Sequence, residues 1–216
     1  MQIPANLQIE ENTTQTLIFH ELQSAEIHAK RDSNTTIVAF LTAEPSAPVT
    51  LNFHLEESGA SITFLAFIIG TKAQNYQIKT ISKHTTPNTN AYYYIRSALF
   101  DEAKIDYFGN LVIDKIAQQT DCYLAHNSLM LSPKAHTDTE PCLEIEANDV
   151  TAGHSATVGR TDESLLFYLM SRGLDRRQAE ELLIQGFMQA DLDKISDPEV
   201  REKLAQEIEQ QLQCLT

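Results

Sequence analysis

Short segments rich in β-branched and aromatic residues follow one another through residues 1–158, at intervals of roughly ten to fifteen residues. In Val49–Leu55 apolar and polar side chains alternate, as they do in a strand that buries one face. No ten-residue amphipathic helix pattern interrupts the series, which argues against parallel βαβ units. The segments predicted as strands are Thr16–His20, Ala25–Ala29, Thr36–Thr42, Val49–Leu55, Ser61–Ile69, Tyr76–Ser82, Ala91–Leu99, Ala103–Phe108, Cys122–His126, Cys142–Ala147 and Thr151–Val158.

Hairpin turn signals are almost absent between these segments. Before residue 150 the only glycines are Gly59, Gly70 and Gly109, and no Asn-Gly or Asp-Gly pair occurs. A parallel β-solenoid needs no hairpin turns, because each coil continues into the next through a bend. The sequence has no strict internal period, so a β-sandwich remains the alternative at this point.

The hydrophobic period changes to 3.6 residues after residue 158, which predicts three helices. Thr161 or Asp162 can cap the first, and Gly173 lies where a left-handed glycine ends a helix. Asp175, with a glutamine three residues later, begins the second, and Asp197-Pro198 begins the third. We therefore predict a β domain over residues 1–158 and a helical domain over residues 159–216.

The first predicted helix is unusual because Leu165–Met170 is apolar around its whole circumference. A single surface helix would expose much of that apolar area. We expect it to pack both on the β domain and on the other helices, or alternatively against another protein.

Composition restricts the classes of partner. Sixteen basic and thirty acidic residues leave a net charge of −14, dispersed along the chain, which argues against nucleic acid and anionic membrane as partners. The longest apolar run, Ile62–Ile69, is too short to span a bilayer. Met1–Glu11 has no pattern of a secretion signal, and three cysteines without a CxxC pair suggest reduced thiols. We expect a cytoplasmic protein.

Motifs of common enzyme classes are absent: the sequence has no phosphate-binding loop, no G-x-S-x-G and no H-E-x-x-H. Histidines and cysteines do gather between residues 122 and 154, and we single out His126, Cys142 and His154. Thiolate, imidazole and carboxylate can all ligate iron. The spacing is equally compatible with structural side chains, such as a hydrogen-bonded strand histidine.

The segment Leu143–Arg160, LEIEANDVTAGHSATVGR, resembles the hallmark segment of the SufB/SufD family, whose members are scaffold components of the SUF iron–sulfur cluster assembly machinery. The resemblance continues through DE at 162–163, LFYL at 166–169, SRG at 171–173 and LLIQGF at 182–187, and covers roughly residues 120–190. It implies a right-handed parallel β-helix followed by a C-terminal helical domain.

The resemblance also implies partners and a cargo. The helical domain would dock the SufC-type ABC ATPase, through a surface organised by Leu166, Phe167, Tyr168, Arg172 and Phe187. The β-helix would pair with a SufB-like subunit or with a second copy, through strands between Thr120 and Val158. A transient iron–sulfur cluster would assemble at that junction, with no cofactor tightly bound. His154 matches the family histidine of this junction, and His126 and Cys142 are weaker metal-ligand candidates.

Three positions depart from the family pattern. Ala152 stands where SufD-like sequences often have cysteine, and Ser155 stands where SufB-like sequences have glutamate. His126, directly before Asn127–Met130, stands where a SufB-like protein has its functional cysteine. The chain therefore resembles SufD more than SufB, and it is shorter than typical members.

Three functions follow from these observations. The first is a non-catalytic SufD-like scaffold subunit that works with a partner ATPase. The second is a structural dimerisation module of the same fold that has lost cluster chemistry, as Ala152 and Ser155 suggest. The third, a β-helix enzyme acting on polysaccharide, is disfavoured by the missing secretion signal and by the hallmark segment.

Overall fold

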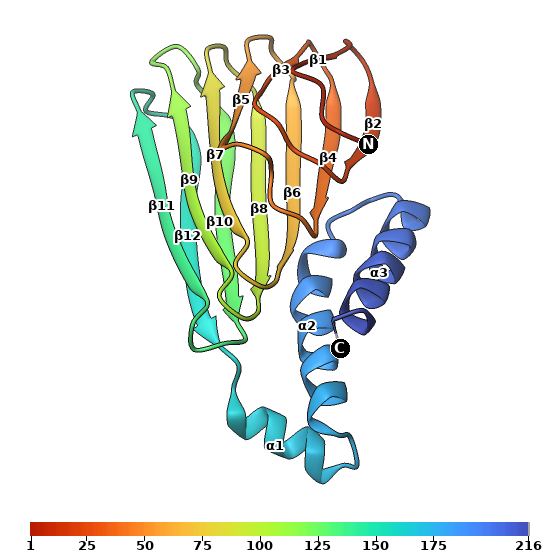
Figure 1. The fold of residues 1–216 in the computed structure, drawn as a ribbon. Helices are drawn as coiled ribbons and strands as arrows, with labels where there is room; N and C mark the ends of the chain where they lie inside the picture. The colour runs from red at the N-terminus through yellow and green to blue at the C-terminus, as the bar shows by residue number, and fades with distance from the viewer. Residues whose placement is uncertain (216) are drawn as a thin grey trace.

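The computed structural model describes residues 1–215 as a parallel β-solenoid followed by three helices (Figure 1). The even-numbered and odd-numbered strands form two separate six-stranded sheets, in the orders β1-β3-β5-β7-β9-β11 and β12-β10-β8-β6-β4-β2. Every strand pairing is parallel, which confirms the solenoid and excludes the β-sandwich. The strands are β1 (Asn6–Ile9), β2 (Thr14–Phe19), β3 (Ala25–Ala29), β4 (Asn34–Leu41), β5 (Val49–Leu55), β6 (Ser61–Gly70), β7 (Asn75–His84), β8 (Asn90–Leu99), β9 (Lys104–Ile113), β10 (Thr120–Met130), β11 (His136–Ile145) and β12 (Val150–Arg160).

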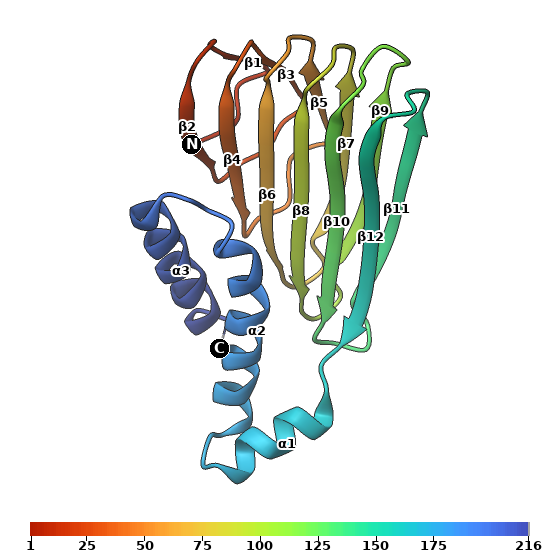
Figure 2. The same cartoon turned by 180° about the vertical axis from the view of Figure 1, so that it is seen from behind.

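The coils lengthen along the chain, which explains why the sequence shows no period. In the even-numbered sheet Thr14 pairs with Asn34, Asn34 with Ser61, Ser61 with Asn90, and Asn90 with Asp121, which are steps of 20, 27, 29 and 31 residues. Strand length grows from 4 residues in β1 to 11 in β12. The solenoid is therefore narrow at its N-terminal end and wide at its C-terminal end (Figure 2).

The bends between the sheets use left-handed residues of which only one is a glycine. Backbone hydrogen bonds connect consecutive bends in a column, from Asn12 to Arg31, Asp32 to Ser58, Gly59 to Asn88 and Asn88 to Gln118. The φ angles at the corresponding positions are positive in the first five of the six coils: Asn12, Asp32, Gly59, Asn88 and Gln119. Asparagine and aspartate tolerate this conformation better than most residues. A search for glycine therefore misses these bends.

The core fills the space between the two sheets. Phe53, Phe64 and Tyr93 lie at its centre, with ring centroids 5.0–6.4 Å apart, and all three side chains are fully buried. Alternate residues of each strand point into this core, as the period of two requires. Toward the wide end the interior also contains polar side chains, including His84 and His126.

The three helices begin at the predicted caps. Asp162 accepts from the backbone of α1 (Glu163–Ser171), Asp175 and Gln178 form a capping box on α2 (Arg176–Leu192), and Asp197 precedes Pro198 in α3 (Pro198–Gln213). Gly173 has a φ of +100°, as a left-handed residue after a helix should. No helix among residues 1–215 is long and apolar enough to cross a membrane.

The strand predictions differ from the structure at two places. The short strand β1 was not predicted, because Asn6–Ile9 contains only two apolar residues. Strands β9 and β10 continue several residues past the predicted Ala103–Phe108 and Cys122–His126. Strand β11 begins at His136, before the predicted Cys142–Ala147, and ends at Ile145. Polar interior residues such as Ser128 interrupt the apolar pattern there, so the pattern alone underestimates strand length.

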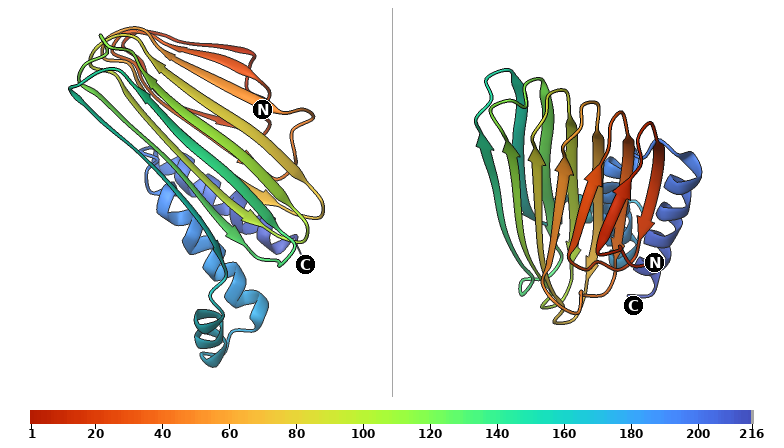
Figure 3. Two further views of the ribbon diagram at one scale, coloured as in Figure 1. Left: turned by 90° about the vertical axis from the view of Figure 1, so that its left-hand side faces the viewer. Right: turned by 90° about the horizontal axis from the view of Figure 1, so that it is seen from above.

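Helices α2 and α3 cover the outer face of the even-numbered sheet (Figure 3). Residues of β4, β6 and β8 that point away from the solenoid core form a second apolar cluster with the helices; its buried members are Val38, Phe40, Leu65, Phe67, Ile69, Ala98, Ile184, Met188, Leu192, Ile195, Leu204, Ile208 and Leu212. Within this contact Arg96 forms an ion pair with Asp191 and donates to the Phe187 carbonyl at 2.7 Å. The helical segment is thus fastened to the solenoid.

Helix α1 does not pack on the β domain. It contacts α2 and extends beyond the end of the sheets (Figures 1 and 2). Leu166 is its one buried residue. The prediction that this apolar helix packs on both layers is therefore wrong, and its exposed face is available to another protein.

Candidate functional site

The wide end of the solenoid presents two long strand edges. Strand β12 pairs with β10 and β11 pairs with β9, and each is the last strand of its sheet in residues 1–215. These edges are 11 and 10 residues long, against 6 and 4 residues for β2 and β1 at the opposite end. An unpaired strand edge offers backbone N–H and C=O groups for pairing with another chain.

His154 lies in the middle of the β12 edge strand. Its register partner is Leu124, a core residue, so the imidazole is on the face of the sheet that points into the solenoid. The side chain is nevertheless exposed, because β12 is the last strand of its sheet. A partner that extended the solenoid here would cover His154.

His126 occupies the same inward face one coil earlier, but it is 1% exposed. Its Nε2 is 3.3 Å from the Ser97 hydroxyl, and its ring meets Tyr107 edge to face at 5.0 Å. Burial lowers the pKa of His126 to about 4, so the imidazole is neutral at pH 7. The structure places this histidine in the core rather than on an accessible surface.

The three cysteines differ in environment. Cys142 is half-buried on β11, where its register partner is Asn110, whose amide donates to Glu144 at 2.7 Å. Cys122 is buried in the core, and desolvation raises the pKa of its thiol to about 12. Cys214 is exposed at the end of α3. A thiol with a raised pKa is a poor metal ligand, which leaves Cys142 and Cys214 as the accessible thiols.

The three predicted metal-ligand candidates do not converge within one chain. His126 is inside the solenoid, and His154 is on the inward face of β12. Cys142 lies on the opposite sheet, with the outward carboxylate Glu144 two residues later. Within residues 1–215 the group of three or more metal-ligating side chains in reach of one another is a different one: Glu26, His28 and His54. Within residues 1–215, the three candidates therefore do not form a metal site with one another.

The predicted docking residues divide into an exposed and a packed set. Phe167 is 74% and Tyr168 51% exposed, and the Arg172 guanidinium lies 5.2 Å from the Tyr168 ring centroid. Leu166, by contrast, is 1% exposed, and Phe187 packs under the Arg96 guanidinium at 4.7 Å. The first three residues can contact a partner, whereas Leu166 and Phe187 hold the helices in place.

The helical end exposes further large apolar side chains. Leu165, Met170 and Leu182 are each between 41% and 48% exposed, and they lie on α1 and the adjoining α2. A group of large apolar side chains in solvent is typical of an interaction surface. The surface formed by Leu165, Phe167, Tyr168, Met170 and Leu182 is called the α1 patch below.

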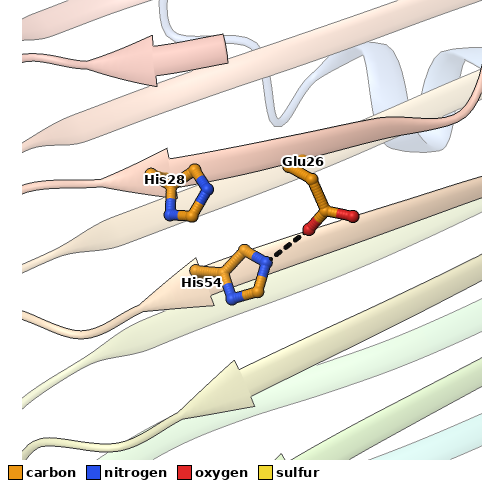
Figure 4. A group of neighbouring side chains, drawn as sticks. All are labelled: Glu26, His28 and His54. Carbon is orange, nitrogen blue, oxygen red and sulfur yellow. Dashed lines mark hydrogen bonds and ion pairs between the residues drawn. The ribbon is translucent and has the colours of Figure 1, made fainter. Parts of the chain in front are cut away.

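The group of Glu26, His28 and His54 was missed in the sequence (Figure 4). Glu26 and His28 are two residues apart on β3, so the alternation of side chains along a strand is enough to place both on one face of the sheet. His54 lies 26 residues later, and only the β3–β5 register brings it opposite His28. The sequence contains no signal for that register.

Comparisons of this chain with a family model and with curated proteins all indicate the same family. The family model described as "SUF system FeS cluster assembly, SufBD core domain" matches residues 5–187. An iron–sulfur cluster assembly SufBD family protein of Mycobacterium leprae is 30% identical over 172 residues, which is 76% of this chain and 44% of the relative. The SufD proteins of Bacillus subtilis and Escherichia coli are 33% and 29% identical, over 67% and 73% of this chain and 33% and 37% of theirs. The chain thus matches less than half the length of these relatives.

Proposed function

The chain belongs to the SufBD family of the SUF system for iron–sulfur cluster assembly, and from this premise we propose that it is a SufD-like scaffold subunit without catalytic activity of its own. It would pair through the wide end of its solenoid and dock a SufC-type ABC ATPase through its helices. The iron–sulfur cluster is then a transient cargo of the paired subunits. The observation that carries the proposal is His154 in the middle of an unpaired 11-residue strand edge.

The geometry of that edge supports the pairing step. A SufB-like subunit, or a second copy of this chain, can add strands to β11 and β12 and so continue both sheets. His154 would then face groups of the partner, because its side chain lies on the inward face of the last coil. Imidazole binds iron through one ring nitrogen, and thiolates or carboxylates of the partner would complete the ligand set.

The role of His154 is auxiliary in this proposal. Ala152 and Ser155, its neighbours in the strand, offer no thiolate and no carboxylate. The chain alone should therefore retain little iron and sulfide after anaerobic reconstitution, and the pair with a SufB-like subunit should retain more. His154→Ala should lower the iron content of that pair without dissociating it, because one imidazole contributes little to a seam of paired strands.

The test is iron and sulfide analysis of the reconstituted pair, with size-exclusion chromatography of the same sample. His136→Ala is the matched control, because His136 begins β11 and is also exposed. A loss of iron in His154→Ala alone supports the scaffold role. Unchanged iron in both variants would instead favour the second function, a dimerisation module without cluster chemistry, which Ala152 and Ser155 also suggest.

The ATPase-docking step rests on the α1 patch. Phe167 and Tyr168 project from a helix that the solenoid does not cover, so their side chains are free to enter an apolar groove of a partner. Point substitutions test this step better than deletion of residues 161–216. Deletion would uncover the apolar outer face of β4, β6 and β8, which α2 and α3 bury.

Phe167→Ala with Tyr168→Ala should abolish co-purification with the ATPase and leave the thermal unfolding midpoint nearly unchanged, since both residues are more than half exposed. Ile116→Ala, at a 67% exposed residue of the β9–β10 bend, is the control. Undiminished binding by the double variant would refute docking through α1.

A further inference from the structure

Glu26, His28 and His54 form a compact group on the outer face of the odd-numbered sheet, at the narrow end of the solenoid (Figure 4). We propose that these three side chains bind one divalent transition-metal ion of the Zn²⁺ or Fe²⁺ class. The proposal does not rest on the scaffold role, because β3 and β5 are separated from the β11 and β12 edges by β7 and β9.

The backbone places all three side chains on one face. Glu26 and His28 are two residues apart on β3, and His54 on β5 is the register partner of His28. Their strand neighbours Ala25, Ile27 and Ala29 are buried in the core, so Glu26 and His28 point outward. Hydrogen bonds between the strands hold this arrangement whether or not an ion is bound.

The ligand atoms are already close to one another. One potential ligand atom from each of the three residues lies within 4.8 Å of the others, and His54 Nε2 is 2.6 Å from Glu26 Oε2. The His28 and His54 rings are stacked, with centroids 4.4 Å apart and planes 8° from parallel. Tetrahedral zinc with bonds of about 2.0–2.1 Å holds its ligand atoms about 3.3 Å apart. Because the lone pair of an imidazole nitrogen lies in the plane of its ring, the stacked rings must tilt away from parallel for both histidines to bind one ion. Rotation of the two side chains would bring this about with β3 and β5 in place.

The Glu26 carboxylate is ionised and is held in orientation by its hydrogen bonds. Hydrogen bonds from His54 and then Asn52 hold the pKa of Glu26 below its usual range, so Glu26 is ionised at neutral pH. Asn52 donates to the other carboxylate oxygen at 2.8 Å, which orients the group as an outer hydrogen bond does around known metal ligands. An ion bound to Nε2 would take the place of the hydrogen bond between His54 and Glu26, and the neutral His54 ring would then carry its one proton on Nδ1, 3.9 Å from Glu56 Oε1.

The charged side chains named around the group are net negative. Glu56 Oε1 lies 3.9 Å from His54 Nδ1, and Lys83 on β7 is the register partner of His54. On the other side of His28 the register partner is Gln8 of β1, which is neutral. Glu26 and Glu56 outweigh the single lysine, so the local field favours a cation.

The ligand set indicates the class of ion. Two imidazoles and one carboxylate suit zinc, iron, cobalt and nickel, whereas calcium and magnesium prefer oxygen ligands throughout. The Glu26 side chain is 47% and the His54 side chain 22% exposed, so water can fill the remaining coordination positions. We expect an exchangeable ion rather than one on which folding depends.

The experiment is titration of the full chain with Co²⁺, followed by absorption, and with Zn²⁺, followed by calorimetry. Cys142→Ser and Cys214→Ser are introduced first, which removes the accessible thiols. We expect one ion per chain and a loss of affinity of at least tenfold in His28→Gln and in His54→Gln. Glu26→Gln should weaken binding as well, because it removes the anionic ligand.

His20→Gln is the matched control, because His20 also pairs with a glutamate, Glu207 at 2.9 Å, but lies outside the group. It should leave the affinity unchanged, and circular dichroism should be the same for all variants. Equal affinity of the unsubstituted chain, His28→Gln and His54→Gln would overturn the proposal, as would the absence of saturable binding. Binding that the cysteine substitutions abolish would also refute it, since the ion would then be held by thiolates.

Discussion

Gly59 shows how a single backbone position limits what the solenoid tolerates. Its φ is +80°, and a Cβ built on it would lie 2.0 Å from Oδ1 of Asp32, the residue at the same bend one coil earlier. The column of bends is stacked through backbone hydrogen bonds, so neither residue can shift without disturbing its neighbours.

We predict that Gly59→Ala lowers the free energy of unfolding by about 1–3 kcal/mol, through backbone strain and this clash. Gly186→Ala is a control for which we expect the opposite change in stability. Gly186 lies inside α2, and a Cβ built on it would meet no atom within 4 Å apart from its chain neighbours and the helix's own backbone, so alanine should stabilise the helix by about 0.5–1 kcal/mol. Urea unfolding of both variants measures this, and equal effects of the two would contradict it.

His84 and His126 make stability depend on pH. Both are buried in the solenoid, and desolvation lowers the pKa of each to about 4, from 6.5 for a histidine in water. Between these values the unfolded chain binds a proton that the folded chain does not, so the free energy of unfolding falls as the pH decreases.

We predict that each histidine contributes a slope of up to about 1.4 kcal/mol per pH unit between pH 6.5 and pH 5. Stability should be full above pH 7. His126→Gln should remove roughly half of the slope, because His84 retains its bonds to Ser82 and Thr89. Urea unfolding midpoints at several pH values provide the measurement, and a slope that His126→Gln leaves intact would show that other groups control it.

At the scale of elements, the contact of α2 with the solenoid contains one buried ion pair. Arg96 of β8 is paired with Asp191 of α2, and the aspartate side chain is 3% exposed. Lys194 adds a second contact to Asp191 at 3.1 Å. Around this pair the apolar cluster of α2, α3 and the sheet excludes water.

We predict that Asp191→Ala lowers the free energy of unfolding by about 3–5 kcal/mol, because it leaves the Arg96 charge buried without a countercharge. Hydrogen exchange in α2 should accelerate as the helix separates from the sheet. Glu102→Ala, which breaks the exposed pair with Lys134, is the control and should have no measurable effect. If Asp191→Ala and Glu102→Ala had the same free energy of unfolding, the buried ion pair would not be what stabilises the contact of α2 with the sheet.

At the scale of the molecule, the solenoid widens toward an end that is open in the single chain. Ile145 and Val158 are 40% and 42% exposed on the two final strands. Apolar side chains beside long unpaired edges are features that proteins avoid unless the edge is covered.

We predict that the chain, alone or with a SufB-like subunit, forms a dimer through this end. Ile145→Lys with Val158→Lys should shift the sample to monomer in sedimentation experiments at micromolar concentration, because each ammonium would have to be desolvated in the seam. Leu182→Lys, an exposed apolar residue of the α1 patch, should leave the dimer intact. A dimer that persists in the first variant and dissociates in the second would place the interface on the helices.

Local patterns were enough to predict the parts of this protein that depend on near neighbours in the chain. The alternation in Val49–Leu55 identified a strand, and the caps at Asp162, Asp175 and Asp197 identified helix starts, because these features involve residues a few positions apart. The hallmark segment around His154 indicated the family, which the comparisons confirm. The absence of hairpin signals correctly favoured a solenoid.

Tertiary structure alone decided what depends on register and packing. The approach of His54 to Glu26, the burial of His126 and the exposure of α1 all depend on contacts between residues distant in the sequence. Coil length varies from 20 to 31 residues, so no sequence period reveals which residues become neighbours. That choice is made by the packing of side chains between the two sheets, where a shift of one residue would turn every core side chain toward solvent.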